Sequence, residues 1–184
     1  MKKTVLTFGL ISGAISSLMM MAFLPFMHKI GFTKGLVIGY TAIVLSFLLV
    51  FFGIRSYREN VGNGRISFTK AFAVGICITL ISCVFYVVTW EIVYFKFLPG
   101  DFMDKYSAQT IEKLKASGAS PAAVEAKVQQ QKKLQEQYQN PLFNSLMTFI
   151  EPFPIGLAIT LISAAVLRRK PLAKPSQSPL PASH

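Results

Sequence analysis

The sequence predicts an all-α, polytopic membrane protein: four transmembrane helices, with an extracytoplasmic helical hairpin between the third and the fourth. Three observations support this fold class. Hydrophobic residues make up 52% of the 184 residues and charged residues only 15%, against about 25% charged residues in soluble proteins. The apolar residues gather in four runs, each near or above the ~20 residues that cross a bilayer. Lys and Arg outnumber Asp and Glu by 19 to 8, and they cluster at the ends of these runs, as orientation by positive charge requires.

The four expected spans cover residues 4–27, 35–54, 67–97 and 142–167. The first is longer than the ~7–15 apolar residues of a signal peptide core, so we expect it to be retained as a helix. The fourth contains Pro152 and Pro154. Because proline lacks an N–H group and disfavours the α conformation of the residue before it, we expect a kink or break at Glu151. Residues 1–170 therefore form one membrane domain, and the proline-rich residues 171–184 are expected to be a disordered tail.

The distribution of basic residues predicts the orientation. Short segments on one side hold ten of them: Lys2, Lys3, Arg55, Arg58, Arg65, Lys70, Arg168, Arg169, Lys170 and Lys174. The long loop on the other side mixes lysines with acidic residues. Because short basic segments stay in the cytosol, both termini and the basic loop at residues 52–68 are expected inside and residues 101–140 outside. Arg55, Arg58 and Arg65 are candidate contacts for lipid headgroups.

The outer loop has the capping residues of two helices, over residues 101–117 and 121–139. Asp101 and Ser120 are placed as N-caps, and Gly118 as a C-terminal residue of the first helix. The apolar stripe of each helix is thin. We therefore expect a helical hairpin that packs on itself or on the membrane surface.

Small residues recur at every fourth position of the spans. In lipid, helices associate through close backbone approach at such positions. The pattern predicts a compact bundle with little room for a wide pore. The glycines expected at helix contacts are Gly9, Gly13, Gly39, Gly75 and Gly156.

Two carboxylates, Glu91 and Glu151, lie within the spans, where an ionisable group is costly and often functional. With Tyr86, Tyr94 and Lys96 as potential partners, they define a candidate intramembrane polar site. We expect Glu151 to act as a helix cap and hydrogen-bond hub, with proton translocation as the alternative. The side chains of Tyr86, Trp90 and Tyr94 share one helix face, which interfacial anchoring explains better than a ligand cage does.

The sequence offers no catalytic or metal-binding constellation. The histidines are residues 28 and 184, and Cys77 and Cys83 lie six apart within an apolar run. No serine or cysteine has a histidine base in view, and no set of three or four metal ligands converges. We therefore expect no enzymatic activity, no cofactor, no metal and no nucleic-acid partner. Membrane lipid is the expected partner, and a homo-oligomer or a protein partner is left open.

Several motifs are shared with a known family. They include FGIRSYR at 52–58, WEIVY at 90–94, FMDKYS at 102–107, YQNPLF at 138–143 and EPFPIGL at 151–157. On these motifs, residues 4–170 resemble an uncharacterised bacterial family, domain of unknown function 4199. The resemblance implies a small multi-helix inner-membrane protein and no particular activity. We interpret the chain as structural or accessory; the alternative is a small-solute, ion or proton transporter that uses Glu91 and Glu151.

Overall fold

The computed structural model describes residues 1–26, 32–98 and 100–169. The predicted tail at residues 171–184 and both histidines lie outside these residues. The helices are α1 (Lys2–Phe23) with a 3-10 turn η1 (Leu24–Phe26), α3 (Phe32–Asn60), α4 (Phe68–Lys96), α5 (Phe102–Ala116), α6 (Pro121–Tyr138), α7 (Pro141–Ile150) and α8 (Phe153–Leu167).

The predicted all-α fold with four apolar spans is confirmed. Four helical segments are long and apolar enough to cross a membrane, namely Lys2–Phe26, Val37–Asn60, Phe68–Lys96 and Pro141–Leu167. The last of these consists of α7 and α8 together. The chain is therefore a multi-pass membrane protein by the length and composition of its helices.

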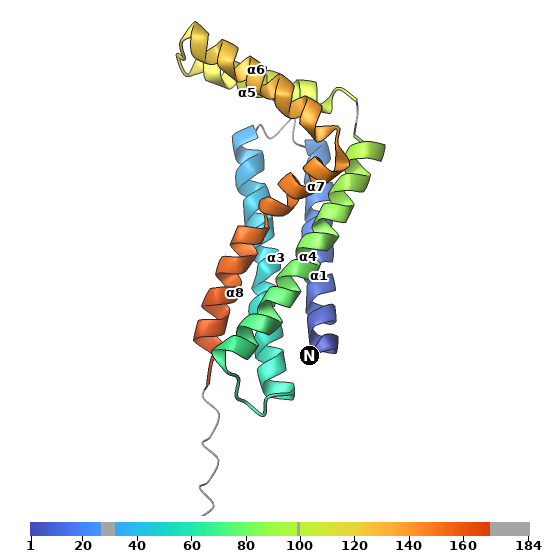
Figure 1. Cartoon of the computed structure of the whole chain (residues 1–184), viewed down its shortest axis with the longest axis vertical. Coiled ribbons are helices and arrows are strands. Elements are labelled where there is room, and N and C mark those ends of the chain that lie inside the picture. The colour runs from blue at the N-terminus through green and yellow to red at the C-terminus, as the bar shows by residue number, and fades with distance from the viewer. Residues whose placement is uncertain (27–31, 99, 170–184) are drawn as a thin grey trace, which may run out of the picture.

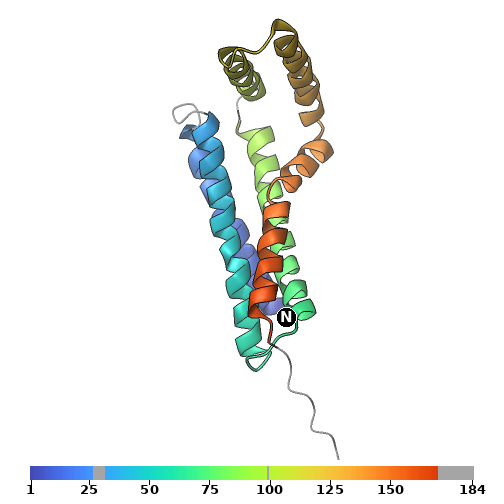
Figure 2. The same ribbon diagram turned by 90° about the vertical axis from the view of Figure 1, so that its left-hand side faces the viewer.

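Helices α1, α3, α4 and α8 run side by side as a bundle (Figures 1 and 2). Helix α4 contacts α1, α3, α7 and α8. The α5–α6 hairpin lies at one end of the bundle, while the N-terminus, the α3–α4 loop and the end of α8 lie at the other (Figure 1). The bundle therefore has a hairpin end and a loop end.

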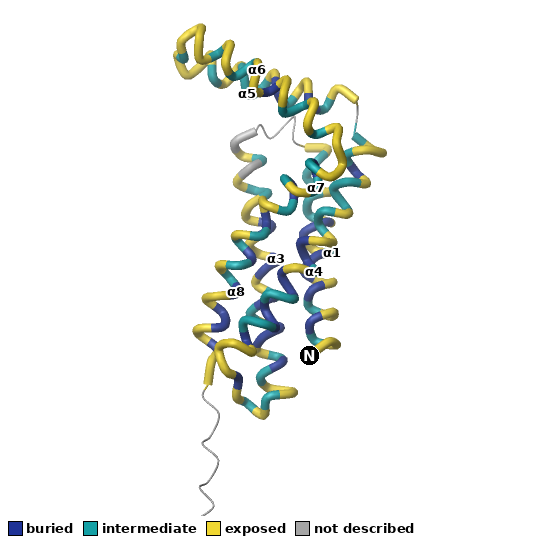
Figure 3. The backbone as a smooth tube through the Cα atoms, in the orientation of Figure 1, coloured by how far each residue is buried: buried dark blue, intermediate teal, exposed yellow. Residues whose placement is uncertain are grey.

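Buried residues face the inside of the bundle and exposed residues face outward (Figure 3). Val50 and Ile54 of α3 pack with Val74 and Ile78 of α4 in a fully buried apolar cluster. Large apolar side chains remain exposed on the outer faces, among them Val84, Ile162 and Val166. A soluble protein rarely exposes so much apolar surface, and these faces are suited to lipid contact.

Small residues lie where the helices approach most closely. A Cβ atom added to Gly9 would lie 2.9 Å from Ile81, and one added to Gly13 would lie 2.7 Å from Phe85. A Cβ atom added to Gly75 would lie 2.8 Å from Thr160, and one added to Gly156 would lie 2.5 Å from Thr79. These distances leave no space for a side chain at the four glycines.

Gly39 differs from the other glycines that were expected at helix contacts. No atom lies within 4 Å of a Cβ added there. The prediction that Gly39 lies at a helix contact is therefore wrong. Helix α7, which could cover this part of α3, packs on α4 instead.

Hydrogen bonds join the closely packed helices. The hydroxyls of Thr79 and Thr160 are 3.0 Å apart, which links α4 to α8. Ser82 Oγ donates to the carbonyl oxygen of Gly9 at 3.1 Å, which links α4 to α1. Such bonds supplement close packing in lipid, where bringing helices together gains no hydrophobic free energy.

The basic segment at residues 52–68 is not a loop throughout, which corrects the prediction. Helix α3 continues to Asn60, so Arg55 and Arg58 are helical and only residues 61–67 form the turn. Asn63 and Gly64 have positive φ angles of 47° and 78°, which turn the chain sharply. The helix extends because no proline or glycine interrupts residues 54–60.

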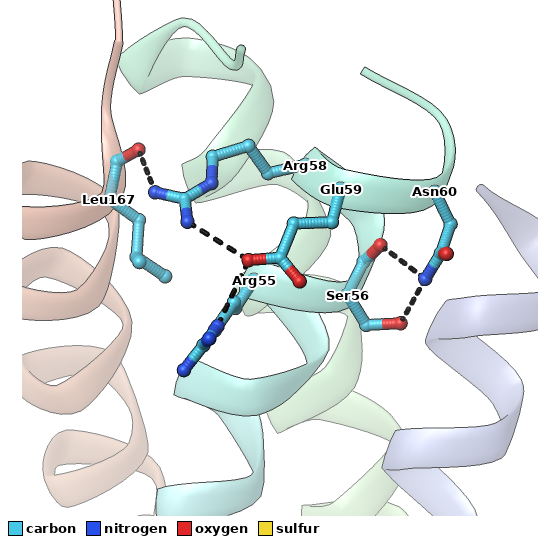
Figure 4. Close-up of polar contacts among 6 residues, drawn as sticks. All are labelled: Arg55, Ser56, Arg58, Glu59, Asn60 and Leu167. Carbon is cyan, nitrogen blue, oxygen red and sulfur yellow. Dashed lines mark hydrogen bonds and ion pairs between the residues drawn. The ribbon is translucent and has the colours of Figure 1, made fainter. Parts of the chain in front are cut away.

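Arg58 closes the loop end of the bundle (Figure 4). Its Nη1 donates to the Leu167 carbonyl oxygen at 3.4 Å, where α8 ends, and its Nη2 lies 3.2 Å from Glu59. The backbone N–H of Arg169 donates to the Ile66 carbonyl at 2.9 Å. The Arg58 side chain therefore bonds to α8 rather than extending toward lipid headgroups. Arg55 is half-exposed and forms an ion pair with Glu59 at 3.0 Å.

Helices α5 and α6 begin and end close to the predicted residues. Ser120 accepts a hydrogen bond from the N–H of Ala123 at 3.3 Å, and Gly118 has a φ of +78° after α5. Asp101 precedes α5 without a side-chain cap bond and instead pairs with Lys105 at 2.7 Å. Gln135 donates to Asp104 at 2.9 Å, which links the two helices.

Candidate functional site

The fourth span is broken where the sequence predicts a break. Helix α7 ends at Ile150 and α8 begins at Phe153, because Pro152 and Pro154 cannot donate the hydrogen bonds that would continue the helix. Glu151 itself keeps α-helical angles, φ −67° and ψ −58°, so it is not displaced from the α region as expected. The two helices therefore point in different directions. Helix α8 packs against α3 and α4, whereas α7 packs on α4. Figures 1 and 2 show α7 apart from the upper part of α3.

This divergence leaves a cavity of about 290 Å³ beneath the α5–α6 hairpin. Its walls come from α1, α3, α4 and α7, and residues of α5 and α6 cover it. Most of the lining is apolar or aromatic. The lining residues are Ser16, Met20, Phe23, Leu24, Gly35, Ile38, Gly39, Ala42, Ile43, Tyr86, Trp90, Phe102, Met103, Tyr106, Leu134, Tyr138, Met147, Thr148 and Glu151.

Glu151 is the charged residue of this lining. Its side chain is exposed, and no side chain that the structure describes forms an ion pair with it. The N-cap of α8 is Pro152, with no side-chain cap bond. The expectation that Glu151 caps the helix and acts as a hydrogen-bond hub is therefore wrong.

Tyrosines from three helices line the cavity together with Glu151. Its carboxylate interacts electrostatically with Tyr86 of α4. Burial raises the pKa of the Tyr106 phenol in α5 and of the Tyr138 phenol in α6, and the negative charge of Glu151 adds to both shifts. The Glu151 carboxylate therefore lies close enough to these half-buried phenols to act on them through its charge.

The hydrogen-bond hub is Asn144 of α7, which sequence reasoning missed. Its side chain is fully buried. Asn144 Oδ1 accepts from Trp90 Nε1 at 2.8 Å and from Thr148 Oγ1 at 3.3 Å, and Nδ2 donates to the Tyr138 carbonyl at 3.3 Å. These bonds connect α4, α6 and α7 at the cavity wall. An amide within an apolar run of the fourth span was the signal that could have found it.

The remaining residues of the predicted polar site lie outside the cavity lining. Ser145 of α7 interacts with the Glu91 carboxylate, while Glu91 Oε1 is buried without a hydrogen-bond partner among the described residues. The Tyr94 ring packs against Trp90 and Tyr138, with centroids 5.7 and 6.3 Å away. Lys96 is exposed at the end of α4. The structure thus brings Tyr86, Trp90 and Glu151 together in the cavity lining and leaves Glu91, Tyr94 and Lys96 outside it.

Cys77 and Cys83 are free thiols, half-buried and buried respectively. Within residues 1–26, 32–98 and 100–169, no group of three or more His, Cys, Asp or Glu side chains is placed to hold a metal ion. The chemistry that the described site offers is therefore that of one carboxylate among aromatic rings.

The family model described as "Protein of unknown function (DUF4199)" matches residues 7–169. The chain belongs to the DUF4199 family. The match covers every residue of the described cavity lining, so this site lies wholly within the DUF4199 region. No match was found among the curated proteins or among the solved structures.

Proposed function

We propose that this DUF4199 protein is a structural or accessory component of the bacterial cytoplasmic membrane and not an enzyme. The observation that carries the proposal is the packed layer below the cavity. There Gly156 of α8 lies against Thr79 of α4 and Phe47 of α3, with no space for a side chain. A layer this tight favours a scaffold over a channel, because a wide pore needs separated helices. Association with a second copy or with another membrane protein fits this role.

Flux measurements in liposomes test this role. The purified full chain is reconstituted, and proton and ion movement is followed with pH-sensitive and ion-sensitive dyes. We expect no flux above that of empty liposomes, together with co-purification of a stable partner or a second copy after mild crosslinking. A flux that the Glu151→Gln variant abolishes would replace the accessory role with transport.

A transporter is the second candidate, and it is favoured by a cavity whose carboxylate forms no ion pair with a described side chain. Acidic residues inside spans often mark proton or ion paths. A path that uses both predicted carboxylates needs Glu91 and Glu151 to line one route, and only Glu151 lines this cavity. The two glutamate-to-glutamine variants therefore distinguish transport through this cavity from a route that uses both carboxylates. If transport uses this cavity, Glu151→Gln should abolish it and Glu91→Gln should leave it unchanged.

We also propose that both termini are cytosolic and that the α5–α6 hairpin is extracytoplasmic. Arg55 and Arg58 lie near the end of α3 and Arg65 lies in the α3–α4 loop, which is at the loop end of the bundle, and this concentration of basic residues supports the proposed orientation. With Cys77 and Cys83 removed, Ser117→Cys should react with an impermeant maleimide in intact spheroplasts. The matched variant Val61→Cys in the α3–α4 loop should react only after lysis. The reverse pattern would invert the topology.

A further inference from the structure

The cavity walls combine a carboxylate with aromatic rings. Glu151 lines the cavity with Tyr86, Trp90, Tyr106 and Tyr138, and its charge acts on all three tyrosines. No described side chain forms an ion pair with Glu151. A carboxylate within an apolar span needs a proton, a hydrogen-bond donor or a counter-charge.

The lining defines the chemistry of a ligand. Aromatic faces attract a cation within about 6 Å of the ring, and they attract it most strongly where water is excluded. We propose that this cavity binds a small organic ammonium ion with an apolar body, with Glu151 as its counter-charge and the Trp90 and tyrosine rings as its walls. The volume of about 290 Å³ is close to the lower limit of ~300–1,000 Å³ for small-molecule sites.

Two features distinguish an organic ammonium ion from other ligands. A hard divalent cation prefers several carboxylate and carbonyl oxygens, whereas Glu151 is the one carboxylate among the described lining residues. An anion would be repelled by the same carboxylate. The apolar lining is suited to the hydrocarbon part of an amphiphilic cation.

The Trp90 ring is fixed in place before any ligand enters. Its Nε1 donates to the buried Asn144 at 2.8 Å, and its ring lies in a T-shaped arrangement with the Phe102 ring, with centroids 6.4 Å apart. A ring held in this way loses little conformational entropy on binding, which favours affinity. The binding site does not depend on the accessory role, because a scaffold and a transporter could each have it.

Trp90 also provides the fluorescence signal for a binding assay, because it is the single tryptophan of the sequence. Benzyltrimethylammonium is titrated into the full chain in maltoside detergent, and intrinsic fluorescence is recorded. We expect a saturable change, and at least a tenfold rise in Kd for Glu151→Gln, about 1.4 kcal/mol of binding free energy. Neopentylbenzene, the neutral carbon isostere, should bind at least tenfold more weakly than the cation. The matched variant Glu91→Gln should keep the wild-type Kd.

A second variant tests the location without removing the charge. Gly39 lines the cavity and has open space around it, so Gly39→Leu should fill the cavity and abolish the saturable signal. Val37→Leu, on an exposed face of the same helix, should bind normally. Equal Kd values for wild type and Glu151→Gln, equal binding of the neutral isostere, or unchanged binding by Gly39→Leu would each overturn the proposal.

The ammonium group could belong to a soluble amine or to a lipid headgroup, and competition separates these sources. A short-chain phosphatidylethanolamine is added during the titration, with phosphatidylglycerol as the control. Weaker probe binding with phosphatidylethanolamine alone supports the proposal and assigns the site to a lipid ammonium. Probe binding that neither lipid weakens supports the proposal and assigns the site to a soluble amine. A saturable signal lost equally to both lipids would overturn recognition of the cation.

Discussion

Replacing Gly156 by alanine should destabilise the bundle, while the same change at Gly39 should not. A Cβ at Gly156 would lie 2.5 Å from Thr79 Cγ2 and 2.9 Å from Phe47 Cζ, although carbon atoms in contact are normally ~3.5–4.0 Å apart. Thr79 cannot simply turn away, because its hydroxyl contacts the Gly156 carbonyl at 3.4 Å and Thr160 at 3.0 Å. Helices α4 and α8 must therefore separate by roughly 1 Å.

The expected net cost follows from two opposing terms. Inserting a methyl group into a packed layer costs about 1–3 kcal/mol, and alanine regains about 0.5–1 kcal/mol over glycine within a helix. At the middle of these two ranges, Gly156→Ala should lower the free energy of unfolding by about 1 kcal/mol. Gly39→Ala meets no atom within 4 Å, so only the helix term remains, and it should raise the free energy of unfolding by about 0.5–1 kcal/mol.

The measurement is unfolding by sodium dodecyl sulfate in mixed maltoside micelles, followed by circular dichroism. Both variants have the same chemical change, so the difference between them isolates the packing contribution. The packing argument is refuted if both variants shift the midpoint in the same direction by similar amounts. A Gly156→Ala midpoint equal to wild type would likewise show that α4 and α8 are not in close contact there.

Two further predictions follow from polar contacts. Asn144→Leu should lower the free energy of unfolding by about 2–3 kcal/mol in the same assay, because it leaves the Trp90 N–H and the Tyr138 carbonyl without their partner. A loss below the ~1 kcal/mol of one ordinary hydrogen bond would contradict the role of Asn144 as a hydrogen-bond hub. Arg58→Met should increase hydrogen exchange at the last turn of α8, since its guanidinium bonds to the Leu167 carbonyl, while exchange in α1 stays unchanged.

The architecture was largely predictable because membrane helices are constrained by backbone hydrogen bonding and span length. An apolar run of the right length must be helical in lipid, and the predicted N-cap Ser120 accepts a bond from the backbone N–H of Ala123 at the start of α6. The end of α3 was less predictable. Arg55 and Arg58 mark the membrane edge in composition, but a change in polarity does not end a helix, and α3 continues to Asn60.

The site was only half predictable, because a span sequence does not say which residues of different helices meet. Glu151 stands out by its cost in a span, but its lack of a described ion-pair partner depends on where α7 and α8 point. Asn144 carries no charge, so its position in the sequence does not mark it as a site residue, although it connects three helices. Tyr106 and Tyr138 lie in the polar hairpin, and nothing in their own segments indicates that they cover a cavity.

The stripe of small residues has opposite consequences in different parts of this bundle. In α8 the glycine at position 156 faces Thr79 and lets the backbones touch. In α3 the glycines at 35 and 39 follow the same period, yet both line the cavity with no atom within 4 Å of an added Cβ. The difference arises at Pro152, since α7 beyond the break packs on α4 rather than on α3. A proline break and a glycine stripe on the facing helix thus together open space for a ligand, and the break places Glu151 at that space.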